Sequence, residues 1–453
     1  MAKRRNSRAG SRKAKPLPSE PVNLIINSLS HEGRGVGKVE GKTVFVDGAL
    51  IGEEVSAQIT FQRGKFDEAR AVSIENPNPE RVIPPCEFYG TCGGCSMQHL
   101  TSSAQILHKQ SILKEQLEHF ASTKPQEWLE PLQADLTAYR RKARLGVRYV
   151  SKKERTLIGF REKYSNFLAD IKSCKVLDVR VDAILMPMSE LIDTMDSRQF
   201  IPQIEVTCGD DSVAIIVRHL QPLTEKDRAL WISFAQQQNI IVYLQSKGPK
   251  TVARLWPIEN SDALLSYKLP EYDLELLMEP LDFSQVNASI NRKMLPLAID
   301  LLEVNKEDEV LDLFCGLGNF TLPLAKIAKR VVGVEGVIDM VERATENAKH
   351  NNLKNVQFYQ TDLASDLTGQ PWISTNFNKI LIDPARSGAI EVIPNIIKFN
   401  PDRIVYVSCN PATLARDTGE LVKSGYELIK AGVMDMFPHT SHVESIALFV
   451  KKK

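Results

Sequence analysis

Apolar strands and helical segments alternate regularly from about residue 281 to the C-terminus, and this alternation restricts the fold more than any other feature of the sequence. Short apolar runs such as 309–314, 330–334 and 403–408 are each followed by a segment that reads as a helix. Strands separated by helices run parallel, because each helix returns the chain to the same end of the sheet. We therefore predict an α/β fold for residues 281–453, with a doubly wound, Rossmann-like parallel sheet.

The first strand of this region leads into a glycine-containing turn, Cys315-Gly-Leu-Gly-Asn-Phe320, which is followed by a helix. Glycines at 316 and 318 let the chain turn tightly and let a ligand approach the backbone. The turn lacks the GxGxxG spacing of a dinucleotide site, and it also lacks the GxxxxGK[ST] spacing of a P-loop.

Acidic residues end three successive strands, namely Glu335, Asp362 and Asp383. All three fall on the carboxyl edge of the predicted sheet, where sheets of this type bind their ligands. Glu335, at the tip of the second strand, is placed to accept hydrogen bonds from both hydroxyls of a ribose. Together with the glycine turn, these residues indicate an adenosine ligand without a pyrophosphate, S-adenosylmethionine.

Cys409 follows the strand 403–408 and precedes Asn410, Pro411 and a helix. It lies on the same edge as the predicted cofactor and next to a helix N-terminus, which favours the thiolate. A free cysteine is also often a small buried hydrophobe. The residues alone therefore leave two interpretations of Cys409 open, a nucleophile and a core residue.

The 57 basic and 56 acidic residues nearly balance, but residues 1–15 hold seven basic side chains and no acidic one. We expect residues 1–19 to form a disordered basic arm that meets polyanions, although a solubilising tail has the same composition. No apolar run of roughly 18 residues, the length of a membrane span, occurs. The basic N-terminus is not followed by the apolar stretch of a secretory signal. We expect a cytoplasmic protein, and a monomer by default.

At 453 residues the chain is long enough for about three domains. Five short runs punctuated by glycine predict a small OB-like β-barrel over 20–79, with Val55, Ala57, Ile59 and Phe61 on one buried face. A proline-rich linker follows it.

Residues 80–280 mix strands and helices without regular alternation, which predicts an α+β central domain. Its helix at 101–121 begins with Ser102 and Gln105 at capping-box spacing. This helix could instead pack on the C-terminal domain. A strand at 139–150 places Arg140, Lys142, Arg144 and Arg148 on one face, which suits contacts with RNA phosphates or a merely solvated surface.

Three of the seven cysteines, Cys86, Cys92 and Cys95, lie together in CEFYGTCGGC, and Cys174 lies far along the chain. Four thiols in this arrangement could hold zinc or a four-iron cluster. The spacing favours iron–sulfur, because zinc sites more often show two CxxC pairs. His99 and Cys208 are expected to be structural.

The segments LDLFCGLGNFTLPLA, IDPARSG, VSCNPATLARD and HVESIALF together resemble the RNA uracil-C5 methyltransferase family. The barrel resembles a TRAM domain, and the cysteines resemble the [4Fe-4S] site of that family, with Cys86, Cys92, Cys95 and Cys174 as ligands. The resemblance covers nearly all of 20–453. The combination of a TRAM domain, a cluster site and a methyltransferase domain resembles the domain composition of the family branch that modifies 23S ribosomal RNA.

The resemblance implies an S-adenosylmethionine-dependent enzyme that methylates C5 of a uridine in 23S ribosomal RNA, with no DNA or membrane partner expected. It makes Cys409 the nucleophile that attacks C6 and Glu444 the base that removes the C5 proton. The implied cofactor residues are Gln285 of FSQVN, Phe314, Asn319, Glu335, Asp362 and Asp383. The alternatives are the same chemistry on another ribosomal or transfer RNA uridine, and a non-catalytic iron–sulfur RNA-binding protein.

Overall fold

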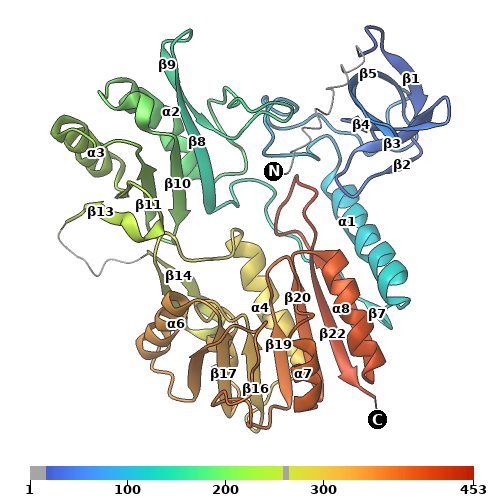
Figure 1. Ribbon diagram of the computed structural model, residues 1–453, viewed down its shortest axis with the longest axis vertical. Coiled ribbons are helices and arrows are strands. Elements are labelled where there is room, and N and C mark those ends of the chain that lie inside the picture. The colour runs from blue at the N-terminus through green and yellow to red at the C-terminus, as the bar shows by residue number, and fades with distance from the viewer. Residues whose placement is uncertain (1–16, 259–264, 453) are drawn as a thin grey trace, which may run out of the picture. The chain divides into compact units, whose positions relative to one another are not determined.

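A computed structural model describes residues 17–258 and 265–452 of the chain (Figure 1). The chain divides into two compact units, residues 1–82 and 83–453. The predicted basic arm falls mostly on residues 1–16, which lie outside the described residues.

The first unit is a six-stranded sheet with the order β1-β5-β6-β4-β3-β2. We predicted five strands, but the run that begins at Val22 breaks at Ile26 and Asn27. There the backbone changes partner, because Ile26 N–H donates to Glu53 O and Asn27 N–H donates to Val36 O. The strands are β1 (Val22–Ile25), β2 (Ser28–Leu29), β3 (Gly35–Val39), β4 (Lys42–Asp47), β5 (Glu54–Gln62) and β6 (Phe66–Glu75).

Strand β3 approaches β1 at Gly37, and this approach closes the sheet into a small barrel (Figure 1). A Cβ at Gly37 would lie 2.5 Å from Ile25 O, so the position requires glycine. Val55 and Ile59 are buried in the barrel as predicted. The prediction for Phe61 is wrong: its side chain is 47% exposed, because a register shift between Ile59 and Phe61 turns it outward.

The central part of the second unit is a sheet with the order β13-β12-β11-β10-β8-β9, and α2 and α3 cover one face of it (Figure 1). Its elements are β8 (Lys142–Val150), β9 (Arg155–Gly159), α2 (Val179–Asp193), η2 (Arg198–Phe200), β10 (Gln203–Cys208), β11 (Val213–Arg218), α3 (Glu225–Gln238), β12 (Ile241–Gln245), η3 (Pro249–Thr251) and β13 (Val252–Trp256).

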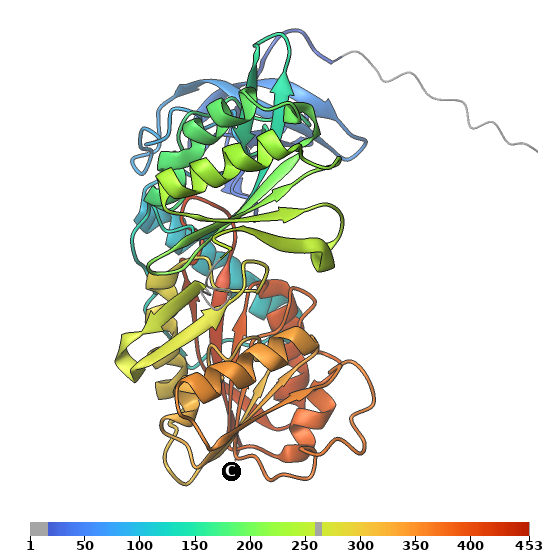
Figure 2. The same ribbon diagram turned by 90° about the vertical axis from the view of Figure 1, so that its left-hand side faces the viewer.

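A hairpin of β14 (Leu265–Leu269) and β15 (Leu274–Met278), joined by η4 (Pro270–Tyr272), lies between the central sheet and the C-terminal sheet (Figure 2). Apolar side chains of all three form one continuous core. The hairpin is also bonded to α6 (Ile338–His350), since Asn347 Nδ2 donates to Leu277 O and its Oδ1 accepts from Leu277 N–H.

The C-terminal sheet has the order β18-β17-β16-β19-β20-β22-β21-β7, and its first five strands are parallel. The prediction of a Rossmann-like sheet is therefore confirmed. Strand β22 runs antiparallel to both β20 and β21. The remaining elements are α4 (Ala288–Leu302), β16 (Glu309–Leu313), α5 (Thr321–Ala325), β17 (Arg330–Glu335), β18 (Val356–Gln360), β19 (Lys379–Ile382), α7 (Ile393–Phe399), β20 (Arg403–Ser408), α8 (Pro411–Lys423), β21 (Tyr426–Met434) and β22 (Glu444–Lys451).

The two faces of this sheet bury different helices. Apolar side chains of α4, α5, α6 and the hairpin cover one face, while those of α1 (Ser102–Gln116), α7 and α8 cover the other. A π-helical turn, η1 (Leu117–Ala121), extends α1, and the short strand β7 (Glu127–Trp128) pairs with β21. None of the helices among the described residues is long and apolar enough to cross a membrane.

Helix α1 differs from its sequence prediction at its N-terminus. Thr101, and not Ser102, is the N-cap, and its side chain accepts a hydrogen bond from Ala104 N–H. The expected partner of the capping box, Gln105, is completely buried and binds Leu100 O and the backbone of His439 instead. Further along the helix, Lys109 Nζ lies 2.6 Å from Asp435 Oδ1, and both side chains are at most 1% exposed.

We predict that Lys109→Met lowers the free energy of unfolding by about 3–5 kcal/mol, because the substitution leaves the Asp435 carboxylate buried without its cation. Urea unfolding measures the change. The double variant Lys109→Met/Asp435→Leu should lose less than the single variant. Lys226→Met is the matched control, because the Lys226–Asp196 pair is 60% and 56% exposed and contributes about 1 kcal/mol at most. Equal losses for Lys109→Met and Lys226→Met would contradict the assignment.

Candidate functional site

The parallel strands of the C-terminal sheet bring the predicted cofactor residues to one edge. Leu313 pairs with Val334 on one side and with Ile382 on the other. The next residue of each strand is therefore Phe314, Glu335 or Asp383, and these three leave the sheet side by side. The sheet pairing thus supports the grouping that the sequence suggested for them.

The turn after β16 presents its backbone to the tip of β17. Phe314, Gly316 and Gly318 have φ values of 64°, 55° and 97°, in the left-handed region that glycine adopts without strain. Gly316 N–H donates to Glu335 Oε2 at 3.2 Å, and the other carboxylate oxygen of Glu335 accepts from Gly336 N–H at 2.8 Å. These hydrogen bonds therefore hold the Glu335 carboxylate against the backbone of the glycine turn.

Asn319 and Gln285 border the same region from the side of the hairpin. The amides of Asn319 and Asn291 form two reciprocal hydrogen bonds of 2.9 Å, and Tyr267 Oη donates to Asn319 Oδ1 at 3.0 Å. Gln285, Asn291 and Tyr267 line one pocket. The structure thus connects Gln285 to Asn319 through residues that the sequence analysis did not identify.

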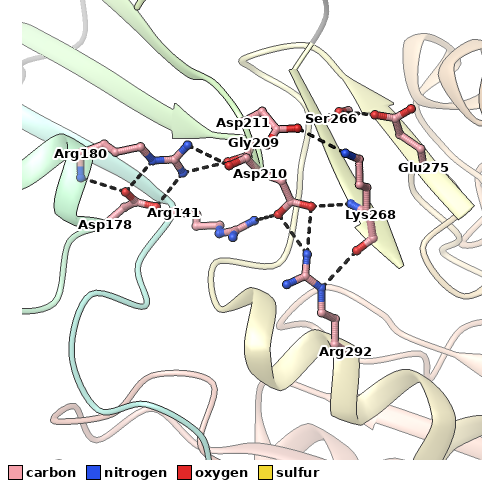
Figure 3. Close-up of polar contacts among 10 residues, drawn as sticks. All are labelled: Arg141, Asp178, Arg180, Gly209, Asp210, Asp211, Ser266, Lys268, Glu275 and Arg292. Atoms are coloured by element: carbon pink, nitrogen blue, oxygen red, sulfur yellow. Dashed lines mark hydrogen bonds and ion pairs between the residues drawn. The ribbon is translucent and has the colours of Figure 1, made fainter. Parts of the chain in front are cut away.

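A charged network fixes α4, which carries Asn291, to the central sheet and the hairpin (Figure 3). Asp210, which follows β10, accepts hydrogen bonds from Arg292 at 2.9 Å and 3.0 Å. It also accepts from Arg141 and from the backbone of Lys268. These cations hold the pKa of Asp210 below its usual value despite partial burial.

Cys409 lies opposite Glu444 across two paired strands. Strand β20 pairs with β22 in the register Ser408↔Ser445, so the next step of this register aligns Cys409 with Glu444. Asn410 caps α8 through a hydrogen bond from Ala412 N–H, and Pro411 starts the helix. The sharp change from strand to helix leaves Cys409 partly exposed at the edge that holds Asp383.

The electrostatics of Cys409 differ from the prediction. Burial, followed by repulsion from Glu444 and Asp383, raises the pKa of Cys409 to about 11. The expectation that the helix N-terminus favours the thiolate of Cys409 is therefore wrong, because burial and the two carboxyl groups have the larger effect. Burial also raises the pKa of Asp383 to about 7, and burial together with Asp383 raises the pKa of Glu444 to about 8.

Two residues of this site were missed in the sequence. Asp312 lies within β16, and burial, Asp383 and Glu335 raise its pKa to about 8. One of its carboxyl oxygens is buried without a hydrogen-bond partner among the described residues. Arg386 lowers the pKa of both Cys409 and Glu444. Its place in IDPARSG, just after a strand end, was the available signal.

Asp362 is the one predicted cofactor residue that the described contacts do not join to the others. Its side chain is exposed and accepts a hydrogen bond from Ala364 N–H, within its own turn. Cys315 is buried in the cofactor turn, and burial raises the pKa of its thiol well above the ordinary value. This agrees with a structural role for Cys315.

The residues at this edge fit a cationic cofactor. Asp312, Asp383 and Glu444 are carboxyl groups whose pKa values are raised, and Asp312 retains an unpaired oxygen. A positively charged ligand would favour the ionised form of each. The sulfonium and ammonium groups of S-adenosylmethionine meet this requirement, while Glu335 and the glycine turn suit its ribose.

The four predicted ligand cysteines line one cavity, although they are spread over residues 86–174. Apolar side chains, including Phe88, Phe160 and Ile171, form much of its wall. Among the described residues no group of three or more His, Cys, Asp or Glu side chains has the geometry of a site for a metal ion. A single zinc ion needs its thiolates at about 2.3 Å, whereas a four-iron cluster separates its thiolates more widely.

The thiols of this cavity influence one another. Burial raises the pKa of Cys95 to about 12 and that of Cys174 to about 11, and repulsion from Cys86 and Cys92 adds to both. The four sulfur atoms are thus close enough to interact electrostatically. Bound cationic metal reverses this effect, because it favours thiolates. Four thiols around one cavity form a donor set that either zinc or an iron–sulfur cluster can use.

The predicted basic strand is only partly available to RNA. Along β8 the apolar residues are buried, as expected, and Arg144 and Arg148 are exposed. Lys142 Nζ instead donates to Asp282 O, and Arg144 pairs with Glu205 at 3.1 Å. Tyr139, at the start of the predicted strand, is buried and donates to Pro438 O.

Residues 101–453 match the model of the tRNA (uracil-5-)-methyltransferase family, and residues 20–72 match the TRAM domain. The chain is 51% identical to the 23S rRNA (uracil(1939)-C(5))-methyltransferase RlmD of Alcanivorax borkumensis, over 98% of this chain and 99% of the relative. It is 50% identical to the protein of the same name from Hahella chejuensis, over 97% of this chain and 100% of the relative.

The fold is similar to the crystal structure of Pyrococcus abyssi tRNA (uracil-54, C5)-methyltransferase in complex with S-adenosyl-L-homocysteine. The TM-score is 0.71 at 23% identity, with 95% of this chain and 100% of that chain covered. The Rossmann-like methyltransferase fold and the TRAM domain are therefore confirmed. The family model matches residues 101–453, and both relatives are at least 50% identical to this chain over nearly their whole length. The chain therefore belongs to the tRNA (uracil-5-)-methyltransferase family, the RNA uracil-C5 methyltransferases.

Proposed function

We propose that this protein transfers the methyl group of S-adenosylmethionine to C5 of one uridine in 23S ribosomal RNA, as a cytoplasmic monomer. The observation that carries the proposal is the alignment of Cys409 with Glu444 beside Asp383, on the edge that fits the cofactor. The relatives named for U1939 of 23S ribosomal RNA favour that nucleotide over a transfer RNA uridine. The TRAM domain supports an RNA substrate.

In our proposal, RNA binding, cluster binding and methyl transfer are carried out by three different parts of the chain. Residues 20–79 bind RNA, residues 80–280 carry the cluster and a second RNA surface, and residues 281–453 perform the chemistry. Arg144 and Arg148 are the exposed cations of β8 that suit phosphates. The helix at 101–121 packs on the C-terminal part, since apolar side chains of α1 belong to the same core as those of α8.

Cys409 starts the reaction by adding its sulfur to C6 of the uracil. Addition places the electrons of the C5–C6 double bond on C5, which then accepts the methyl group. The cofactor, when bound, supplies this methyl on a sulfonium that leaves as a neutral thioether. Arg386 favours the thiolate of Cys409, and its effect opposes that of Asp383 and Glu444.

Glu444 completes the reaction by accepting the C5 proton. The electron pair of the C5–H bond re-forms the C5–C6 double bond and expels the Cys409 thiolate. Glu444 must be ionised to act, although burial and Asp383 raise its pKa to about 8. Arg386 and Lys109 both favour the ionised form, and so would a cationic ligand beside Asp383.

The proposed cofactor residues have distinct tasks. Glu335 binds the ribose, and Phe314 and Asn319 shape the turn around it. Gln285 closes the site from the hairpin side, and Asp383 faces the positive charge. Asp362 lies near the adenine of the cofactor. We also propose a [4Fe-4S] cluster on Cys86, Cys92, Cys95 and Cys174, which would close the loop 86–100 and shape the central domain without transferring electrons.

Replacing the nucleophile tests the proposed function. Cys409→Ala should lower the methylation rate by on the order of 10³-fold or more, because the addition to C6 is lost. RNA containing 5-fluorouridine, incubated with S-adenosylmethionine, should form an adduct with the parent protein that survives denaturing electrophoresis. Cys409→Ala should form none, whereas Cys208→Ala, which changes another buried cysteine, should form it. Turnover of Cys409→Ala at the parent rate would refute the mechanism.

The raised pKa values predict how cofactor affinity depends on pH. Asp383, with a pKa of about 7, and Asp312 and Glu444, with pKa values of about 8, are protonated at pH 6 and ionised at pH 8.5. Affinity for S-adenosylmethionine should therefore rise across this interval, by up to about tenfold per pH unit for each group below its pKa. Isothermal titration calorimetry measures the dissociation constant.

S-adenosylhomocysteine is the matched control, because it lacks the sulfonium charge and should show a smaller rise. Asp383→Asn should flatten the dependence for S-adenosylmethionine. A fall in affinity with rising pH, or the same slope for both ligands, would count against the charge assignment.

Metal analysis tests the proposed cluster. Protein purified without oxygen should contain about four iron atoms per chain and show broad visible absorbance. Cys174→Ser should lose most of the iron, because it removes one of the four thiolates, while Cys208→Ser should retain it. Zinc in place of iron, or equal iron in both variants, would exclude the proposed ligand set.

A further inference from the structure

The segment that leads into Glu444 is held almost entirely by residues from outside the sheet. We call residues 435–443, between β21 and β22, the base segment. It contains no helix or strand, and its His439 has φ 65°, a left-handed conformation that is uncommon for a residue other than glycine. Such a conformation persists when the surroundings fix it.

The cysteine loop provides one part of this support. Ser96 and Met97, which directly follow Cys95, both donate their backbone N–H to His439 O, at 2.9 Å and 3.0 Å. Ser96 Oγ accepts a hydrogen bond from Ser441 N–H at 3.1 Å. Three hydrogen bonds therefore join the residues next to a cysteine of the cavity to the residues just before Glu444.

Helix α1 and Tyr139 provide further support. Gln105 Oε1 accepts from His439 N–H at 2.9 Å, and Lys109 Nζ donates to Phe437 O at 3.0 Å as well as to Asp435. Tyr139 Oη donates to Pro438 O at 3.0 Å. Gln105 and Lys109 lie on helix α1, and Tyr139 lies in the segment just before β8. The cysteine loop has no regular structure of its own, because residues 86–100 contain no helix and no named strand.

A loop without regular structure needs other contacts to keep its shape. The four cysteines supply the means, because a metal cluster would link Cys86, Cys92 and Cys95 to the distant Cys174. The backbone bonds within the loop are local turns, such as those from Tyr89 N–H to Cys86 O and from Cys92 N–H to Phe88 O. Without the metal link the part of the loop around Cys95 is expected to open more readily. Opening would release Ser96 and Met97 from the base segment while α1 remains in place.

We infer that Ser96 is a positioning residue for proton removal, and that the metal-closed cysteine loop holds Glu444 at the distance this step requires. The inference rests on the proposed function, since it assigns Glu444 the role of base. It gives the cluster a task within the reaction that involves no electron transfer. Addition of Cys409 to C6 needs no group of the base segment in contact with the uracil, because Cys409 is carried by β20 and α8.

The two steps can be separated by experiment. When Glu444 is displaced, methyl transfer still occurs but the C5 proton stays, so Cys409 cannot leave. A covalent complex with ordinary uridine RNA should then accumulate and survive denaturing electrophoresis, as it should with Glu444→Gln. For Ser96→Ala we expect turnover to fall about ten- to a hundredfold, the scale of a small misplacement. Its adduct with 5-fluorouridine RNA should form at the parent rate, which shows a folded protein.

Ser111→Ala is the matched control, because Ser111 is exposed on α1 and donates only to His108 O. It should turn over normally and accumulate no complex. Slow turnover of Ser96→Ala without the covalent complex would overturn the inference, and so would turnover at the parent rate.

Hydrogen–deuterium exchange gives a readout that does not depend on activity. Removal of the metal from intact protein with an oxidant and a chelator should speed exchange at the amides of Ser96, Met97 and Ser441, whose hydrogen bonds join the cysteine loop to the base segment. Exchange in β19 should stay unchanged. Ser96→Ala should reproduce the effect at Ser441 in metal-loaded protein. Unchanged exchange in the base segment after metal removal would overturn the inference, whether or not the protein methylates RNA. A parent protein that did not methylate RNA would refute the proposed function alone.

Discussion

The antiparallel pairing of β20 with β22 is the constraint on which the candidate site depends. It aligns Ser408 with Ser445 and so places Cys409 and Glu444, which are far apart in the sequence, across from each other. A shift of one residue would turn each side chain of β22 to the other face of the sheet. Such a shift would disrupt the packing of two cores, since Ile446 and Leu448 pack on one side of β22 and Ala447 and Phe449 on the other.

The sequence predicted the parts of the structure that depend on local pattern. Alternation of strands and helices was sufficient for the parallel sheet, and Glu335 could be recognised from its place at a strand end. Contacts between distant residues could not be predicted in this way. Gln105 looked like part of a helix cap, yet it binds His439, 334 positions along the chain. Glu444 came from family resemblance alone, because the register of β22 has no local signal.

Electrostatics was the other quantity that the pattern did not reveal. A helix N-terminus suggested a thiolate at Cys409, but burial and two nearby carboxyl groups have the larger effect and raise its pKa. Asp312 was overlooked because a single acidic residue in an apolar strand carries no motif. Each of these shifts depends on which groups meet at the sheet edge. Burial and mutual repulsion disfavour the ionised forms of these carboxyl groups, and a neighbouring positive charge would favour them.

Both halves of the candidate site are also fixed by residues that precede the methyltransferase sheet. Asp210 of the central domain binds Arg292 of α4, and the neighbouring Asn291 holds Asn319 of the cofactor turn. Ser96 of the cysteine loop holds the base segment that leads into Glu444. The sheet alone sets which residues face one another, but their distances depend on these contacts. A chain that kept the methyltransferase sheet and lost the central domain would therefore retain Cys409 at its strand end, while the turn and the base would lose their support.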